Sequence, residues 1–404
     1  MKIGIIREGK IPPDSRVVLT PDHCHKIQEK YNIQILVEHS ENRCFDNGTY
    51  SQKGIKVVKN IEDCSILLGV KEVPIDELIP NKTYFFFSHT IKGQVYNRKL
   101  LQAILDKKIR LIDYEVLTNE AGQRVIAFGR FAGMVGAHNA LYTYGQRTSL
   151  FHLDRMTAFD VYNDAVQQYR IINFPNIKVV VTGMGRVANG ACEVLDDMGF
   201  TRVKPLDFTT SCYNNPVYTQ LDVTDYARHK EGKDFSQTDY FENPQSFESN
   251  FRSFYVAADI FINGIFWDTR APAFFTTDEM KQAEFQISVI ADVTCDIAPE
   301  TSVPSTLRAS TIADPIYGYD PRTGTETKPF QTDCIDVMAV DNLPNEMPKD
   351  ASTAFGEQFI EHILPILTKE FNHPMIQRAT IAVNGHLGPH FQYLQDFVNG
   401  APLK

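Results

Sequence analysis

Long apolar runs, metal-binding cysteine motifs and an excess of basic residues are all missing from this chain of 404 residues. Its apolar runs are far shorter than the roughly 20 residues that a membrane-spanning helix needs, so we expect no membrane partner. The opening MKIGIIREGK has no long apolar region or cleavage site of a secretory signal, which predicts a cytoplasmic protein. The formal charge of -10 at pH 7 argues against nucleic acid as a partner.

Closely spaced cysteine pairs are absent as well. No two cysteines show CxxC or other metal-ligand spacing, and their number is odd. We interpret them as reduced thiols and expect no metal site. The seven are Cys24, Cys44, Cys64, Cys192, Cys212, Cys295 and Cys334.

Short apolar runs that alternate with helical patterns are abundant. With 43% hydrophobic and 22% charged residues, the chain has enough apolar material for two cores. The first runs, KIGII, IQILV, SILLGV, YFFF and IRLI, predict strands separated by helices such as residues 21–30 and 97–108. A second set comprises KVVVTG, DIFING, ISVIADV and CIDVMAV. This rhythm is typical of parallel sheets covered by helices.

The two sets of strands predict two domains. Residues 130–147, rich in small residues at helical spacing, are expected to form a connecting helix. We predict an α/β fold of two Rossmann-like parallel-sheet domains with a cleft between them, the chain crossing back to the first domain at its C-terminus. The substrate (catalytic) domain would comprise residues 1–136 and 345–404, and the dinucleotide-binding domain residues 137–344.

Two segments interrupt or complete this pattern. The region around 211–254, and above all the polar stretch 226–249, is expected to be a surface insertion with solvated charges. Residues 355–371 (FGEQFIEHILPILTKEF) predict a helix near the end of the chain, followed by an apolar run, TIAV.

A glycine-rich turn follows the predicted strand KVVVT and precedes a helical pattern. In GMGRVANGA, Gly183 would permit the tight turn, Gly185 would let backbone approach a pyrophosphate, and Ala188 would be small enough for helix–strand packing. Strand, turn and helix in this order predict a dinucleotide site at the helix N-terminus.

An acidic residue stands at about the spacing expected for ribose recognition. Asp207 ends VKPLD, interpreted as the next strand, roughly 20 residues after the turn. A carboxylate there would accept hydrogen bonds from ribose hydroxyls and repel a 2′-phosphate, which favours NAD over NADP. The alternative is an ordinary residue of a turn at a strand end.

Cationic side chains follow the predicted strands of the first domain. Lys71 comes directly after SILLGV, His89 follows YFFFS, and Arg16 lies in the first strand–helix loop. Open α/β sheets hold ligands at the carboxyl ends of their strands, so we expect these groups to line a crevice. Partial desolvation near a second cation would lower the pKa of Lys71 into a range useful for proton transfer. Arg16 has the planar fork that suits a substrate carboxylate.

Several blocks resemble the lysine-forming saccharopine dehydrogenases. They are KTYFFFSHTIKGQ, IRLIDYE, RVIAFGRFAG, INGIFW and VDNLPNEMP, and the similarity is strongest to the lysine–ketoglutarate reductase form. SRVVLTP and VDNLP are shared with a wider superfamily that includes alanine dehydrogenase and the transhydrogenase NAD-binding component. The resemblance spans nearly the whole chain and is weakest from about 211 to 254.

This resemblance implies site residues. Lys71 and His89 would form the acid/base pair, in either assignment of roles. The implied substrate contacts are Arg16, Gln94, Arg124, Phe128, Thr294, Cys295 and Asp296. In addition to Gly183 of the glycine-rich turn, the implied cofactor contacts are Gly185, Arg186, Asp207, Phe266, Val293, Val340, Asp341, Asn342 and Leu343.

The reaction implied by the resemblance is the reversible, NAD-dependent condensation of lysine with 2-oxoglutarate to saccharopine. Gln123 replaces an arginine that touches the dinucleotide in fungal relatives, so NADP is an alternative cofactor. The alternatives for function are an alanine dehydrogenase-like enzyme and a non-catalytic dinucleotide-binding regulator. Flux toward lysine synthesis or degradation and the oligomeric state are left open.

Overall fold

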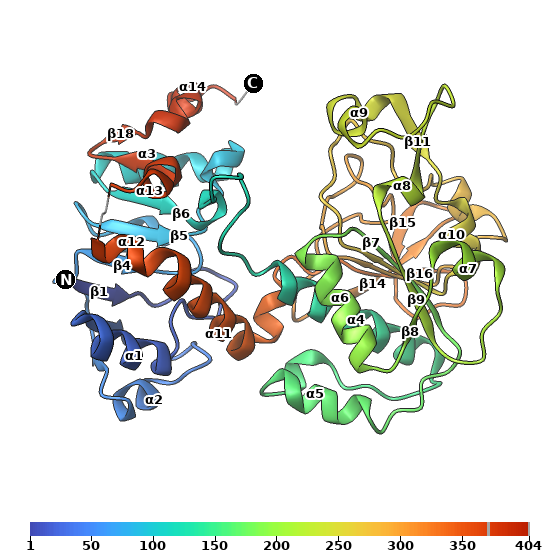
Figure 1. Cartoon of the computed structure of the whole chain (residues 1–404), viewed down its shortest axis with the longest axis horizontal. Coiled ribbons are helices and arrows are strands. Elements are labelled where there is room, and N and C mark those ends of the chain that lie inside the picture. Colours follow the sequence, from blue (N-terminus) through green and yellow to red (C-terminus); the bar gives the residue numbers. More distant parts are fainter. Residues whose placement is uncertain (370–371, 403–404) are drawn as a thin grey trace. The chain divides into compact units, whose positions relative to one another are not determined.

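Residues 1–369 and 372–402 are described by a computed structural model (Figure 1). The chain divides into unit 1, residues Met1–Phe128 with Pro348–Lys404, and unit 2, residues Gly129–Met347. These boundaries lie within eight residues of those predicted at 136 and 345. The predicted return of the chain to the first domain is confirmed by the membership of the C-terminal segment in unit 1.

Unit 1 is built on an eight-stranded sheet with the order β18-β17-β6-β5-β4-β1-β2-β3. β1 to β6 pair in parallel, and the C-terminal β17 and β18 add antiparallel strands at the β6 edge. The strands are β1 Lys2–Ile5, β2 Gln34–Glu38, β3 Lys56–Val58, β4 Ile66–Leu68, β5 Thr83–Phe86, β6 Arg110–Asp113, β17 Thr380–Val383 and β18 His386–Leu387.

Helices complete unit 1. They are α1 Pro21–Tyr31, α2 Asn47–Gln52, α3 Arg98–Asp106, α11 Pro348–Gln358, α12 Leu364–Lys369, α13 Pro374–Ala379 and α14 Gln395–Val398. The start of α1 shows how sequence sets a boundary: Thr20 accepts from the His23 N–H, the His23 side chain accepts from the Thr20 N–H, and Pro21 occupies the first turn. The helix predicted for 355–371 is divided into α11, a wider turn at Phe359–Ile363 and α12, and its last two residues lie outside the described residues.

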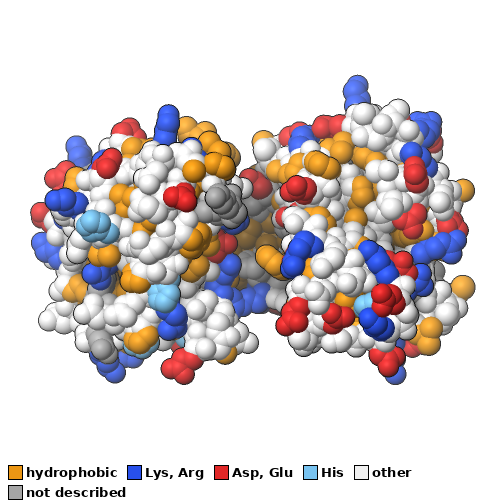
Figure 2. Space-filling view, turned by 90° about the horizontal axis from the view of Figure 1, so that it is seen from above, with side chains coloured by type: hydrophobic (Ala, Val, Ile, Leu, Met, Phe, Trp, Pro, Cys, Tyr) orange, Lys and Arg blue, Asp and Glu red, His pale blue; other side chains and the backbone are white. Residues whose placement is uncertain are grey.

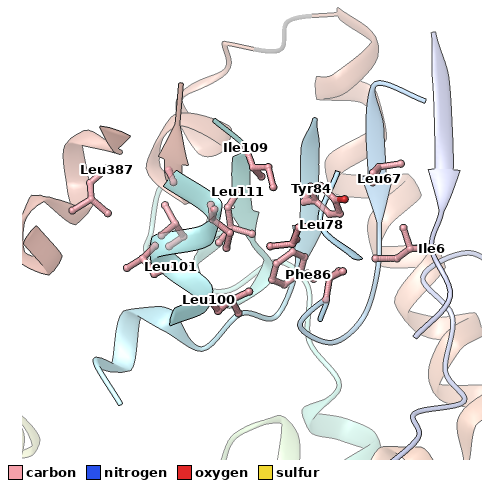
Figure 3. Packing of buried hydrophobic residues seen from close by; sticks show 14 of the residues in the cluster. Ile6, Leu67, Leu78, Tyr84, Phe86, Leu100, Leu101, Ile109, Leu111 and Leu387 are labelled. Carbon is pink, nitrogen blue, oxygen red and sulfur yellow. The ribbon is translucent and has the colours of Figure 1, made fainter. Parts of the chain in front are cut away.

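The aromatic run in β5 is buried on both faces of the sheet, as predicted. Tyr84 and Phe86 point into one core with Leu67 and Leu111 (Figure 3). Phe85 points to the opposite face, where its ring lies 6.3 Å from that of Phe359. Because alternate side chains of a strand point to opposite faces, burial on both faces requires a continuous apolar run. Each such burial contributes roughly 1.5–3 kcal/mol.

Unit 2 contains a second eight-stranded sheet with the order β15-β14-β16-β13-β12-β7-β9-β8. β16 to β8 are parallel, and β14 and β15 form an antiparallel edge. The strands are β7 Lys178–Thr182, β8 Thr201–Arg202, β9 Val217–Leu221, β12 Ile260–Asn263, β13 Val289–Asp292, β14 Ile316–Asp320, β15 Thr325–Thr327 and β16 Ile335–Met338. Two mostly parallel sheets with helices confirm the predicted α/β class.

The helices of unit 2 begin with the predicted connecting helix. They are α4 Gly129–Thr148, α5 Tyr162–Tyr169, α6 Arg186–Asp197, α7 Pro205–Thr210, α8 Val223–Tyr226, α9 Gln237–Glu242 and α10 Arg252–Ala257. Glycines let α4 and α6 approach closely, since a Cβ on Gly133 would lie 1.7 Å from the Val187 carbonyl oxygen and one on Gly190 would lie 2.1 Å from the Arg130 carbonyl oxygen. The small residues of α4 therefore serve packing.

The prediction that the region 211–254 forms a surface insertion is wrong in its bounds. Five consecutive buried residues within it, Val217–Leu221, form β9, which pairs directly with β7 in the main sheet. The polar stretch 226–249 also has a small core of its own. There β10 (Ala227–His229) pairs with β11 (Phe247–Ser249), and the side chains of Ala227, Tyr240 and Phe247 cluster. Aromatic residues replace the missing aliphatics, which is why the composition alone looked polar.

The surface agrees with the modest net charge. On the face drawn in Figure 2, acidic and basic side chains are intermingled on each unit. Throughout residues 1–369 and 372–402, every helix is too short or too polar to cross a bilayer. The same residues contain no cluster of three or more His, Cys, Asp or Glu side chains suited to a metal ion.

Candidate functional site

Two groups of predicted residues lie at the carboxyl ends of parallel strands, one group in each unit. In unit 1, Lys71 follows β4 and His89 follows β5, the neighbouring strand. Arg16 lies in the loop that follows β1, on the other side of β4. Parallel strands expose their carboxyl ends at one edge of a sheet, so this topology gathers the three side chains there.

Lys71 has the electrostatic environment that its position predicted. Its pKa is lowered by burial and, next in size, by the positive charge of Arg16. A lowered pKa increases the fraction of neutral amine near neutral pH, which a proton-transferring lysine requires.

Glu8, which sequence analysis missed, holds the backbone at this point. Its carboxylate accepts hydrogen bonds from the backbone N–H groups of Val70 at 2.7 Å and Lys71 at 2.9 Å. Burial, followed by repulsion from Asp14, raises its pKa to about 7. Glu8 follows β1 as Lys71 follows β4, and neighbouring strand ends carrying opposite charges were the signal that could have revealed it.

Arg16 is more constrained than its sequence position suggested. Its Nε and Nη2 donate to the two carboxylate oxygens of Asp14 at 3.0 and 2.6 Å, and its guanidinium carbon lies 4.2 Å from the centre of the Phe128 ring. The Arg16 residue is only 3% exposed. Phe128 in turn stacks on Phe355 with ring centres 4.4 Å apart. The fork predicted to hold a substrate carboxylate is thus engaged by Asp14.

His89 belongs to a network with a second missed carboxylate. Its Nδ1 lies 3.3 Å from Oε2 of Glu115, and the other oxygen of Glu115 accepts from Arg124 at 3.5 Å. The hydrogen bond with His89 is the main cause of the lowered pKa of Glu115. The structure therefore brings the predicted residues His89 and Arg124 to the same carboxylate. Glu115 was visible in IRLIDYE, but one acidic residue after a strand carries little signal.

The backbone around His89 is positioned by Asp113, the last residue of β6. Its Oδ2 accepts from the Ser88 N–H at 2.9 Å and its Oδ1 accepts from the Glu115 N–H at 2.8 Å. His89 itself adopts the left-handed conformation, with φ 54°. Such a conformation is uncommon outside glycine and is maintained here by the surrounding bonds.

Gln94 lies apart from this network. Its side chain is exposed and accepts a hydrogen bond from the Tyr96 hydroxyl at 2.8 Å.

A cavity of about 500 Å³ opens beside Glu8 at the carboxyl ends of β1, β2 and β3. It is lined by Arg7, Glu8, His39, Ser40, Glu41, Asn42 and Lys59.

In unit 2, the predicted cofactor residues follow four adjacent parallel strands. The glycine turn follows β7, Phe266 follows β12, Val293 follows β13, and Val340 to Leu343 follow β16. Phe266 is 96% exposed, whereas Val340 is buried. Asp341, Asn342 and Leu343 continue from it into the short helix Leu343–Glu346.

The glycine turn fits the backbone approach of a dinucleotide. Gly183 has φ +103°, and a Cβ there would lie 2.8 Å from the Gly264 carbonyl oxygen. Gly185 precedes α6 with open space where a Cβ would stand. Arg186 begins the helix, and Ala188, in the first turn of the same helix, is fully buried. Open space above a helix N-terminus is what a pyrophosphate needs.

Asp207 does not lie at a strand end, so that prediction is wrong. It belongs to the first turn of α7 and is exposed, while β8 contains only Thr201 and Arg202. Pro205 favours the start of a helix, where its missing N–H costs nothing. The proline in VKPLD therefore marks the start of a helix, a signal that the interpretation of this run as a strand overlooked.

A row of buried polar side chains supports the strand ends. Thr182 donates to Asn263 at 3.0 Å, and Asn263 donates to Asp292 at 3.0 Å. The predicted substrate segment continues from it: the Thr294 hydroxyl donates to Asp292 at 2.7 Å. Burial raises the pKa of Asp292. This network, absent from the sequence prediction, fixes the loops after β7, β12 and β13.

The next two residues of that segment are Cys295 and Asp296. The Cys295 thiol lies 3.1 Å from the Ala339 carbonyl oxygen, and burial raises its pKa well above the ordinary range. It therefore behaves as a packed, protonated thiol. The Asp296 N–H lies 3.4 Å from the Thr294 hydroxyl oxygen.

Comparison with known proteins supports the resemblance. Residues 4–135 match the family model described as the alanine dehydrogenase/PNT N-terminal domain. The chain is 26% identical to an alpha-aminoadipic semialdehyde synthase of Arabidopsis thaliana and 28% to the mitochondrial one of Mus musculus, in each case over 97% of this chain. It spans only 41% and 47% of those relatives' lengths.

A second group of relatives matches over most of both chains. The chain is 24% identical to saccharopine dehydrogenase [NAD(+), L-lysine-forming] of Emericella nidulans, over 91% of this chain and 93% of that protein. Among solved structures, an L-alanine dehydrogenase gives a TM-score of 0.65 at 16% identity, covering 98% of this chain and all of that one. A transhydrogenase of Sinorhizobium meliloti gives 0.60 at 12% identity, covering 96% and 100% of the two chains. These structural matches establish the fold.

Proposed function

Because this chain is a relative of the lysine-forming saccharopine dehydrogenases over most of its length, we propose that it is an NAD-dependent oxidoreductase acting on CH–NH groups. Its reaction would join the ε-amine of L-lysine to the carbonyl of 2-oxoglutarate, with loss of water, and reduce the resulting imine to saccharopine. The reaction would be reversible, and we propose a cytoplasmic location.

The observation that carries the proposal is the set of proton-transfer groups at the carboxyl edge of the unit 1 sheet. A lysine with a lowered pKa and a histidine bonded to a carboxylate follow neighbouring strands there. Imine formation and hydrolysis both need protons moved on and off nitrogen and oxygen near neutral pH, which these side chains can do.

We assign the roles as follows. Lys71 takes the proton of the secondary amine in the direction of saccharopine oxidation and returns it in the direction of synthesis. His89, oriented by Glu115, moves the proton of the water that adds to the imine. Burial lowers the pKa of Lys71, and the charge of Arg16, which is engaged by Asp14, lowers it further. The contact of Arg16 with a substrate carboxylate stays a prediction.

The half-exposed Arg124 is a further candidate for binding a substrate carboxylate. Gln94 and Phe128, with Thr294, Cys295 and Asp296 of unit 2, remain predicted substrate contacts. The glycine turn and the residues after β12, β13 and β16 would hold the dinucleotide, which supplies hydride chemistry when bound.

An alanine dehydrogenase-like activity is the second candidate, favoured by the match of residues 4–135 and by the shared fold. A regulator that binds a dinucleotide without turnover is the third. The test is the absorbance of reduced nicotinamide in the presence of purified protein, with lysine plus 2-oxoglutarate or with ammonia plus pyruvate, using NADH and NADPH in turn.

Oxidation of NADH that depends on both lysine and 2-oxoglutarate is the expected result. Oxidation only with ammonia and pyruvate would replace the proposal with the alanine dehydrogenase reading. Cofactor binding without oxidation in any mixture would favour the third candidate, a dinucleotide-binding regulator without turnover.

A further inference from the structure

The strand beside β7 decides where a ribose-binding acid can stand. In dinucleotide-binding sheets the glycine turn follows one strand, and the acid that binds the adenosine ribose ends the parallel strand next to it. Here that neighbour is β9, because the order at this side of the sheet is β12-β7-β9-β8. The first residue after β9 is Asp222.

Asp222 stands next to the glycine turn. Thr182 of β7 pairs with Leu221 of β9, and the Gly183 N–H donates to the Leu221 carbonyl oxygen at 2.9 Å. The Gln220 side chain donates to the Gly183 carbonyl at 2.9 Å and to Asn189 of α6 at the same distance. The end of β9 is thus joined both to the turn and to the helix that follows it.

Asp207 lacks this position. It follows β8, the edge strand, which is separated from β7 by β9. Arg202 of β8 lies at the level of Tyr218 and hence of Val179, three residues before Thr182 in β7. At about 3.3 Å per residue, β8 ends roughly 10 Å short of the edge where the turn lies.

The expectation that the ribose-binding acid stands roughly 20 residues after the glycine turn fails here for a topological reason. The chain leaves α6, forms the short edge strand β8 and helix α7, and only then returns as β9. The strand adjacent to β7 is therefore later in the chain than this expectation assumes, and its terminal acid is displaced with it.

The surroundings of Asp222 are acidic and ordered. Its N–H donates to Asp225 at 2.9 Å, and its carboxylate caps the short helix α8. A carboxylate offers about four acceptor positions, so capping leaves capacity for ribose hydroxyls. Residues 222–226 read DVTDY, two acids without a lysine or arginine. A 2′-phosphate at the end of β9 would be repelled by these two carboxylates.

We infer that Asp222, and not Asp207, is the residue of this chain that binds the adenosine ribose and selects NAD(H) over NADP(H). This inference rests on the proposed use of a dinucleotide. It makes the cofactor preference a property of the end of β9.

Direct binding of NADH and NADPH to the full chain tests this inference. The fluorescence of each reduced dinucleotide, measured as it is titrated with protein, gives its affinity. The matched variants are Asp222→Asn and Asp207→Asn. Asparagine also caps helices well, so Asp222→Asn is expected to keep the fold, which thermal unfolding checks. Asp222→Glu, which restores the charge, is the conservative rescue.

The wild type is expected to bind NADH more tightly than NADPH. Asp222→Asn should reduce that preference at least tenfold, Asp222→Glu should retain most of it, and Asp207→Asn should leave it within about twofold. Loss of the preference in Asp207→Asn, or its persistence in a folded Asp222→Asn, would overturn the inference.

The inference and the proposed function fail in different ways. A wild type that binds neither dinucleotide would remove both. A wild type that binds NADH with the predicted response to Asp222→Asn, yet does not oxidise it with lysine and 2-oxoglutarate, would leave the ribose assignment standing and remove the reaction.

Discussion

At the scale of single residues, the proposed function depends on charges whose solvation is controlled by neighbouring strands. Lys71 illustrates this: burial and Arg16 both disfavour its protonated form, and Arg16 is itself held by Asp14. The same carboxyl edge carries Glu8, whose raised pKa has the complementary cause, burial together with a like charge. Each of these groups is tuned by residues distant in sequence.

Replacing Lys71 by methionine tests its role in proton transfer. Methionine keeps most of the apolar length of lysine but cannot carry a proton, so we expect kcat with lysine and 2-oxoglutarate to fall about 10²–10⁴-fold. The NADH dissociation constant should remain unchanged. Lys99→Met, at an exposed position of α3, is the control and should leave kcat intact. Near-normal turnover by Lys71→Met would remove this lysine from the mechanism.

Glu8 predicts a pH dependence of stability. Its pKa in the folded protein is about 7, above the ordinary value of 4.5, so between these values the folded state binds more protons than the unfolded state. The contribution of this group is fully present below pH 4.5 and is lost as the pH rises through 7. We expect the free energy of unfolding of the wild type, relative to Glu8→Gln, to fall by on the order of 1–3 kcal/mol across that window.

Urea unfolding at pH 4.5 and 7 measures this difference. Glu120→Gln, at an exposed site in the same unit, provides the comparison. A wild type and a Glu8→Gln variant with parallel pH profiles would show that the carboxylate ionises as freely in the folded protein as in the unfolded one.

At the scale of elements, the packing of α4 against α6 supports the glycine turn that precedes α6. Close approach of the two helices depends on Gly133 and Gly190, whose positions leave no space for a Cβ. Such packing lets α6 begin at the end of β7, where its N-terminus faces open space.

Gly133→Ala is predicted to separate these helices. The added Cβ would lie 1.7 Å from a backbone carbonyl oxygen, which side-chain rotation cannot relieve, so we expect a loss of at least about 2 kcal/mol. Calorimetric melting should register this as a Tm lower by roughly 4–8 °C. Gly129→Ala, in the first turn of the same helix, meets only side-chain atoms at 3.5 Å and should melt near the wild type. Equal melting of both variants would contradict the close-packing account.

At the scale of the whole molecule, the predicted proton-transfer residues belong to unit 1 and the glycine turn to unit 2. Binding of the dinucleotide and chemistry on the amino acid can therefore be damaged separately. Lys71→Met, described above, is the first half of this separation.

Gly185→Val tests the complementary case, in which dinucleotide binding is damaged. The backbone of Gly185 is extended and a Cβ there meets no atom within 4 Å, so the variant should fold with a Tm close to that of the wild type. A valine side chain would nevertheless fill the space through which a pyrophosphate approaches the α6 N-terminus, and NADH affinity should fall at least about tenfold. Gly183→Val provides the contrast, because φ +103° and the Gly264 carbonyl make it damaging to the fold itself. Unchanged NADH binding by a folded Gly185→Val would move the cofactor away from this turn.

The sequence alone determined what depends on local pattern. The aromatic run Tyr84–Phe87 predicts a doubly buried strand because each side chain of a strand must face an apolar layer. The turn at Gly183 and Gly185 is equally local, since a tight turn before a helix restricts which residues fit. The positions of Lys71 and His89 after their strands follow from the same periodicity.

Only the tertiary structure decided which strand ends become neighbours. The pairing of β9 with β7 joins segments separated by β8 and α7, and it places Asp222 at the glycine turn while Asp207 lies on a helix. The bonds of His89 to Glu115 and of Arg16 to Asp14 likewise depend on side-chain placement after the chain has folded. Hydrophobic periodicity specifies a strand and its buried faces, but strand order arises from contacts summed over the whole sheet, and no local pattern encodes it.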